Sequence, residues 1–149
     1  MATILGIDVG GSGIKAALVD TDTGELLSDR HRLETPEPST PKNMAATVRQ
    51  LVAQFDYAGT VGCCFPTVVI DGKAKTAGNI DETWRNTQVD AKFEDATGLP
   101  FVVLNDADAA GVAEMQLGAG VGLEGMVIMI TIGTASGAAF STMAGSFRI

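Results

Sequence analysis

The chain has 149 residues, 46% of them hydrophobic, which suits a single soluble domain with a sizeable core. Ten basic against eighteen acidic residues give a formal net charge of −8, which argues against a nucleic-acid-binding protein, because such proteins carry a basic stripe. The apolar runs are too short to span a membrane and no secretory signal pattern opens the chain, so we expect a cytoplasmic protein without a membrane partner.

The first predicted element is an apolar strand that runs into a glycine turn. Gly10, Gly11 and Gly13 carry no side chains, so successive backbone N–H groups can point into one concavity that suits phosphate. Asp8, at the end of the apolar run, can orient a water molecule or Mg²⁺, and Lys15 places a positive charge nearby. The pattern therefore predicts a phosphate site, with an ordinary glycine hairpin as the alternative.

The segment after the glycines separates this turn from a dinucleotide fingerprint. Such a fingerprint would open a helix, whereas residues 14–20 and 24–27 are typical of two strands joined by a tight turn, in a meander that continues to residue 33. Asp8 would cost free energy at the end of a buried strand unless it is hydrogen-bonded or faces a cation. Both observations favour the phosphate interpretation.

The middle of the chain predicts alternating helices and strands. A proline-rich connection at residues 35–41 precedes an amphipathic helix whose apolar residues repeat from Met44 to Phe55. In the next strand Cys63 and Cys64 point to opposite faces, so we expect two reduced thiols. The following elements are that strand at 61–65, a small hairpin at 68–76, a polar loop at 78–84, a helix at 89–97 and a buried strand at 101–104.

A second candidate site lies where the strand at 101–104 ends and a helix of small residues begins. Asp106 can take a proton from a sugar hydroxyl as a general base while Asn105 orients that hydroxyl. Either residue can instead simply cap the helix, and Asp108 suits the first helical turn. Residues 125–131 predict a further buried strand, which enters a second glycine turn.

Three motifs together resemble the ROK family of sugar kinases within the actin-like fold. They are D-V-G-G-S-G-I-K from Asp8, L-N-D-A-D-A-A-G from Leu104 and T-I-G-T from Thr131. The resemblance extends almost without a gap over residues 3–134 and is strongest to the family's polyphosphate-dependent glucose kinases. It implies an α/β fold, the actin-like ATPase (ribonuclease H-like) N-terminal domain, with a mixed sheet and flanking helices. It further implies an N-terminal kinase domain at 1–118 and the start of a second domain at 119–134.

The resemblance also implies roles for individual residues. Asp106 would deprotonate the 6-hydroxyl of glucose, while Asn105 and Asn79 would hold sugar hydroxyls. The transferring phosphates and a water-bound Mg²⁺ would meet Asp8, and the phosphates would further contact Gly10, Gly11, Ser12, Gly13 and Lys15, with Thr131, Gly133 and Thr134 in a second phosphate turn. The implied donor is polyphosphate or ATP, and the implied full-length form is a homodimer. Thr67 departs from the family pattern, which has glycine after the proline.

The last residues depart further from the family pattern. After Thr134 the family continues G-I-G, whereas this chain reads A-S-G. Residues 135–149 can be encoded so that restoring one nucleotide yields a family-like continuation, so we hypothesise an out-of-frame tail, which genomic sequencing across codon 134 tests. Without a second domain to close over the site, we expect the isolated chain to be inactive or nearly so.

Three functions remain open at this point. The first is a glucose kinase that uses polyphosphate, ATP or both. The second is a non-catalytic ROK fragment that binds sugar or phosphate without turnover. The third is a ROK-type regulator, although such proteins carry a helix-turn-helix ahead of the first phosphate turn and only three residues precede Ile4 here.

Overall fold

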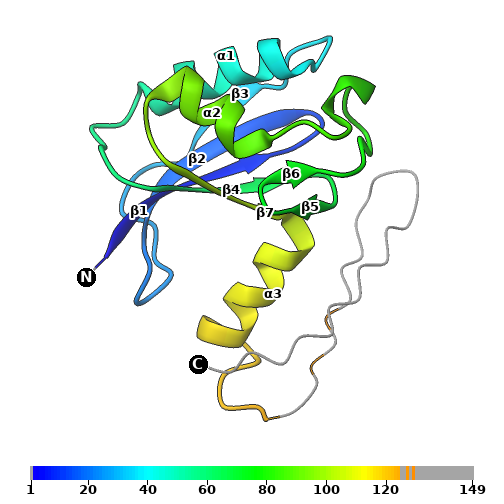
Figure 1. Ribbon diagram of the computed structural model, residues 1–149. Helices are drawn as coiled ribbons and strands as arrows, with labels where there is room; N and C mark the ends of the chain where they lie inside the picture. The colour runs from blue at the N-terminus through cyan, green and yellow to red at the C-terminus, as the bar shows by residue number, and fades with distance from the viewer. Residues whose placement is uncertain (1, 125–126, 128, 130–149) are drawn as a thin grey trace. The chain divides into compact units, whose positions relative to one another are not determined.

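The computed structural model describes residues 2–124, 127 and 129. The chain divides into two compact units, Met1–Asp106 and Ala107–Ile149, and each is described by itself. The first unit contains a five-stranded sheet, two α-helices and a small hairpin (Figure 1). In the second unit the described secondary structure is α3 (Asp106–Leu117), whose first residue belongs to the first unit.

The large sheet is mixed, with strand order β3-β2-β1-β4-β7. Strands β1, β2 and β3 form an antiparallel meander, while β4 and β7 add to β1 in parallel. The carboxyl ends of β1, β4 and β7 therefore meet at one edge, where open α/β sheets bind ligands. The strand bounds are β1 (Thr3–Val9), β2 (Gly13–Asp20), β3 (His31–Glu34), β4 (Val61–Phe65) and β7 (Phe101–Asn105).

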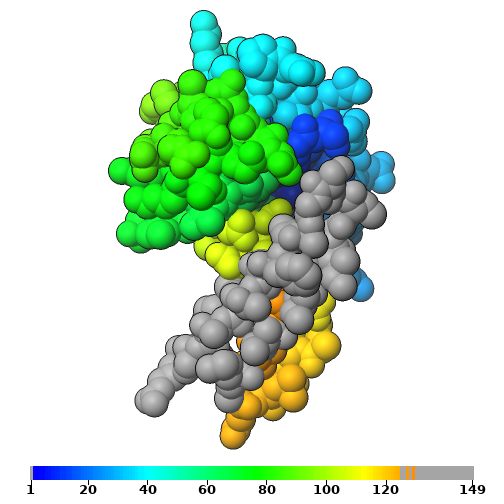
Figure 2. Space-filling view, turned by 90° about the vertical axis from the view of Figure 1, so that its right-hand side faces the viewer, coloured from blue at the N-terminus to red at the C-terminus, as the bar shows by residue number. Residues whose placement is uncertain are grey.

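Two helices cover one face of this sheet (Figure 1). Helix α1 (Pro41–Val52) begins at Thr40, whose side chain accepts the N–H of Asn43, and proline occupies the first helical position, where it loses no hydrogen bond. Helix α2 (Val89–Thr97) ends at Gly98 with φ of 75°, a left-handed conformation that glycine adopts without strain. Their surfaces adjoin in the space-filling view (Figure 2).

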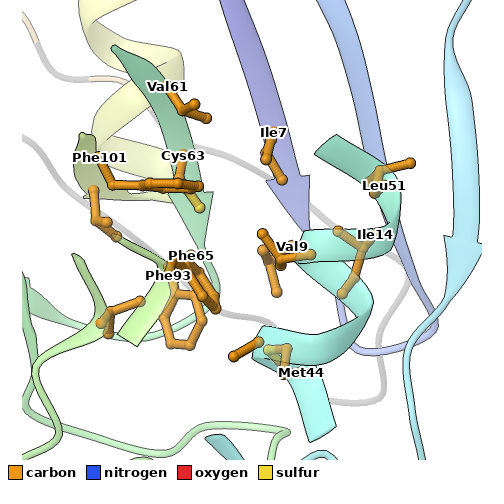
Figure 3. Packing of buried hydrophobic residues seen from close by; sticks show 14 of the residues in the cluster. Ile7, Val9, Ile14, Met44, Leu51, Val61, Cys63, Phe65, Phe93 and Phe101 are labelled. Atoms are coloured by element: carbon orange, nitrogen blue, oxygen red, sulfur yellow. The ribbon is translucent and has the colours of Figure 1, made fainter. Parts of the chain in front are cut away.

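The core lies between the sheet and these helices. Ile7 and Val9 of β1 and Phe65 of β4 point to the helical side, where Met44 of α1 and Phe93 of α2 meet them (Figure 3). Strand alternation produces this pattern, because every second residue points to the same face. Each fully buried large apolar side chain contributes about 1.5–3 kcal/mol by leaving water.

Most elements expected from periodicity are present. The helices at 41–52 and 89–97 are confirmed, and so is the small hairpin, formed by β5 (Val69–Ile70) and β6 (Lys73–Ala74). Both cysteines are free, Cys63 buried and Cys64 partly buried, as their alternation requires. The mixed sheet with flanking helices confirms the predicted fold class.

Three expectations differ from the structure. The meander does not continue as a strand at 24–27, where Leu26 forms only an isolated bridge to Val19. The strand β7 is not buried on both faces, because α1 and α2 cover only one of them and Val102 remains 56% exposed. The loop at 78–84 is not polar throughout, since its last residues form the short 3₁₀ helix η1 (Glu82–Trp84) and Trp84 is fully buried.

The remaining predictions concern the end of the chain. The strand expected at 125–131, apart from residues 127 and 129, lies outside the described residues, and so does the tail at 135–149. The domain boundaries at 118 and 134 stay predictions. In the part of the chain that the structure describes, no helix is both long and apolar enough to cross a membrane.

Candidate functional site

A row of side chains crosses the sheet near the carboxyl end of β1. Asp8 pairs in register with Lys15 of β2 on one side and with Cys64 of β4 on the other. Lys15 in turn pairs with Arg32 of β3, and Cys64 with Leu104 of β7. Because their strand neighbours fill the core, these five side chains lie on the face opposite α1 and α2.

Asp8 is exposed on this face rather than buried. Its side chain is 56% exposed, and its Oδ2 atom lies 3.9 Å from Nζ of Lys15, a surface ion pair that contributes little to stability. The sequence argument that a buried carboxylate at this position needs a cation is therefore wrong, because alternation turns Asp8 away from the core. Its candidate role now depends on its position beside the glycine turn.

The glycine turn, residues 10–13, uses one backbone N–H group for a hydrogen bond within the turn and leaves others without a partner among the described residues. The N–H of Gly10 donates to the carbonyl of Gly13 at 2.9 Å, so this N–H is not available to a phosphate as the sequence suggested. Within the described residues, the N–H groups of Gly11 and Ser12 donate no hydrogen bond. The N–H and the carbonyl of Gly13 both point towards the β1 side of the turn, because the two backbone groups of a strand residue face the same neighbouring strand.

Arg32 lies at this turn, a position that the sequence motifs do not predict. Its Nη2 atom donates to the carbonyl of Ser12 at 3.0 Å. Its guanidinium also occupies the space where a Cβ on Gly13 would lie, 2.5 Å from Arg32 Nε, so a side chain at position 13 would displace the flexible end of Arg32. No local signal identifies Arg32, because its proximity depends on the register between β2 and β3.

Asn105 ties the end of β7 to the loop after β4. Its Nδ2 atom donates to the carbonyl of Thr67 at 2.8 Å, and the N–H of Thr67 donates to the carbonyl of Phe65 at 2.9 Å. Thr67 is only 3% exposed, so the loop is packed where the family pattern has glycine. Asp106 follows as the exposed first residue of α3.

Cys64 has both candidate carboxylates as neighbours. Burial, together with the negative charges of Asp8 and then Asp106, raises the pKa of its thiol from 9.0 to about 11. For the more deeply buried Cys63, burial, Cys64 and Asp8 raise the pKa well above its usual value. The strand register agrees with this, because Asp8 pairs with Cys64 from β1, and Asp106 directly follows β7, whose Leu104 pairs with Cys64 from the other side.

The loop that carries Asn79 lies close to the glycine turn. A Cβ on Gly11 would be 4.0 Å from the carbonyl oxygen of Asn79, whose residue is exposed. Two residues on, Asp81 accepts from both the N–H and the hydroxyl of Thr83, which lowers the pKa of its carboxyl. Phosphate and sugar candidates are therefore neighbours, whereas Thr131, Gly133 and Thr134 lie outside the described residues.

A magnesium ion fits this set of residues only if water molecules and substrate phosphates complete its coordination. Among the described residues, no group of three or more His, Cys, Asp or Glu side chains could hold a metal ion. Mg²⁺, however, usually keeps several waters and takes one or two carboxylates together with substrate phosphates. The exposed carboxylate of Asp8 beside the glycine turn suits that arrangement.

This combination of fold and site belongs to a known class of proteins. The model of the ROK family matches residues 4–146, and the chain is a member of the ROK family.

Particular relatives refine the likeness. The chain is 46% identical over 135 residues to the polyphosphate glucokinase of Mycobacterium tuberculosis, covering 90% of this chain and 51% of that protein. It resembles the crystal structure of the inorganic polyphosphate/ATP-glucomannokinase of Arthrobacter sp. strain KM with a TM-score of 0.86 and 40% identity, covering 98% of this chain and 62% of that one. A Streptomyces griseus ROK glucokinase in complex with glucose and AMPPNP matches with a TM-score of 0.76 and 36% identity, over 89% of this chain and 42% of that one. The chain thus spans about half the length of the curated relatives it matches.

Proposed function

We propose that this chain is the N-terminal part of a glucose kinase that transfers a phosphoryl group from polyphosphate or ATP to the 6-hydroxyl of glucose. The observation that carries the proposal is the strand register, which places Asp8 beside Cys64 on one side and the end of β7, followed by Asp106, on the other, next to the glycine turn. The kinship with polyphosphate glucokinases supports the choice of substrate and donor. The function would be exercised in the cytoplasm by a full-length homodimer.

In the proposed reaction, separate residues accept the proton, orient the sugar and bind the phosphates. Asp106 accepts the proton of the sugar hydroxyl, and Asn79 and Asn105 orient the sugar. The N–H groups of Gly11, Ser12 and Gly13 contact phosphate oxygens, since phosphoryl transfer depends mainly on positioning and on stabilising charge. Mg²⁺, held through water by Asp8, would neutralise charge on the donor phosphates. The cations of Lys15 and Arg32 extend the positive side of the site towards β3.

The same proposal limits what the isolated chain does. Closure of a second domain excludes water and completes sites of this kind. We therefore expect the chain by itself to bind ligands weakly and to turn over glucose slowly, so that any glucose-dependent turnover above that of Asp106→Asn identifies the kinase. A second candidate function is a non-catalytic fragment that binds sugar or phosphate, since the neighbouring glycine turn and Asn79 loop could bind these ligands without any phosphoryl transfer.

Activity assays on the purified chain separate these functions. Glucose-dependent consumption of polyphosphate or ATP would support a kinase, and Asp106→Asn should then lower kcat by about 10²–10⁴-fold, the usual contribution of a general base. Glucose binding in calorimetry without turnover would favour the fragment. If neither glucose nor a phosphoryl donor (polyphosphate or ATP) binds in the presence of Mg²⁺, both candidate functions are wrong.

A further inference from the structure

The segment after β3 is tied to the glycine turn at Thr35. Its hydroxyl donates to the carbonyl of Gly10 at 2.6 Å, and its N–H donates to the carbonyl of Ser12 at 3.4 Å. In a planar trans peptide the C=O and the following N–H point in opposite directions. By holding these two carbonyls, Thr35 turns the N–H groups of Gly11 and Gly13 away from itself.

The same segment is tied to the loop of Asn79 at Ser39. The hydroxyl oxygen of Ser39 accepts the N–H of Asp81 at 3.0 Å, and its carbonyl accepts from Nε1 of Trp84 at 2.8 Å. Trp84 is fully buried against Phe65, so this end is anchored to the core. Ser39 thereby fixes the backbone that carries Asn79.

The chain between the two ties has little freedom. It contains Pro36 and Pro38, whose rings restrict φ, and the side chain of Asn43 in α1 donates to the carbonyl of Pro38 at 2.9 Å. Thr40, next to Ser39, caps the same helix. Residues 35–39, which we call the strap, therefore connect two loops through a rigid path attached to α1.

We propose that Thr35 and Ser39 are positioning residues, and that the strap holds the glycine turn and the Asn79 loop in the relative position that lets phosphate and sugar bind together. The proposal rests on the function proposed above. It assigns no contact with substrate to the strap, since Thr35 acts through backbone carbonyls of the turn and Ser39 through the N–H of Asp81.

Calorimetry on the full chain tests the strap with Mg²⁺-tripolyphosphate and glucose as probes. We expect Thr35→Val to weaken tripolyphosphate binding and Ser39→Ala to weaken glucose binding, each by about fivefold, the equivalent of one hydrogen bond. Each ligand should also bind more tightly in the presence of the other, and either variant should reduce this mutual effect. Thr35→Ser and Ser39→Thr keep the hydroxyl and should restore wild-type binding.

Two matched controls lose the same kind of bond outside the site. Thr97 donates its hydroxyl to the carbonyl of Phe93 at 2.7 Å, and Ser28 accepts the N–H of Leu18 at 2.9 Å. Thr97→Val and Ser28→Ala should lower stability like the strap variants while leaving both affinities unchanged. If the strap variants bind as the controls do, the inference is wrong and the proposed function stands. If the wild-type chain binds neither tripolyphosphate nor glucose, the inference and the proposed function are both wrong.

Amide hydrogen exchange on the wild-type chain covers the case in which a strap variant does not fold. Mg²⁺-tripolyphosphate bound at the glycine turn should slow exchange of the Asp81 N–H, which Ser39 accepts, and not only of Asn79, which lies beside the turn itself. Unchanged exchange there, with the glycine turn itself protected, would overturn the inference while leaving phosphate binding established.

Discussion

The two faces of the five-stranded sheet have different tasks although they share the same strands. On the helical face Ile7, Val9 and Phe65 are buried in the core, and on the opposite face Asp8 and Cys64 occupy the intervening positions. Alternation lets one strand supply stability from one set of residues and candidate chemistry from the next. The two faces should therefore respond to substitution in different ways.

The largest effect is expected on the helical face. Trp84→Ala should lower the free energy of unfolding by about 3–5 kcal/mol, because it removes a buried aromatic ring that packs edge-on against Phe65 and Phe93 and leaves a cavity. Urea denaturation measures this loss. Leu104→Ala, at a 41% exposed position on the other face, serves as the control and should cost less than about 1 kcal/mol. Equal losses would show that the faces do not differ as described.

The next effect is expected in the glycine turn. A Cβ on Gly10 would lie 3.0 Å from the backbone carbonyl oxygen of Gly13, so Gly10→Ala must shift the turn. We expect tripolyphosphate binding to weaken by about tenfold, as for the loss of one to two hydrogen bonds, with a smaller change in stability. Gly6→Ala in β1, outside the turn, is the matched control, because its Cβ would make only ordinary contacts at 3.6 Å and beyond. Equal binding by the two variants, measured by calorimetry, would contradict the role of the turn.

A smaller effect is expected at Arg32, the positively charged β3 end of the row of side chains that crosses the sheet near Asp8. Arg32→Gln should weaken tripolyphosphate binding by about three- to fivefold at low salt and less at high salt, since exposed charges are screened. Arg49→Gln removes the same charge from α1, which covers the opposite face, and should change the affinity much less. A titration series at two salt concentrations distinguishes them. The same loss from both variants would mean that only net charge matters.

The smallest effect concerns pH. The pKa of Cys64, raised from 9.0 to about 11, means that the folded state prefers the neutral thiol. The stability that this preference contributes is complete below pH 9 and is lost as pH rises towards 11.

Asp8→Asn removes one of the carboxylates that raise this pKa and should lower the pKa of Cys64. Thiolate absorbance against pH, in a Cys63→Ala background that leaves a single thiol, measures the change. An unaltered pKa would place Asp8 too far from Cys64 to share a site with it.

Periodicity and turn chemistry were enough to predict most of the elements. The apolar spacing from Met44 to Phe55 predicted α1, and the glycine and proline that follow residue 97 predicted the end of α2. The three motifs also indicate the ROK family, to which the chain belongs. These signals are local, since they depend on residues within a few positions of one another.

The details of the candidate site depended on contacts between distant segments. The exposure of Asp8, the approach of Arg32 to Ser12 and the burial of Trp84 all follow from strand register and from packing against residues far along the chain. Local composition cannot specify these pairings, because the same strand can pair in registers that differ by one residue and expose opposite faces. The sequence therefore determined the family, the order of elements and the candidate residues. Only the tertiary structure decided which of them meet, because proximity across a sheet depends on how its strands are aligned.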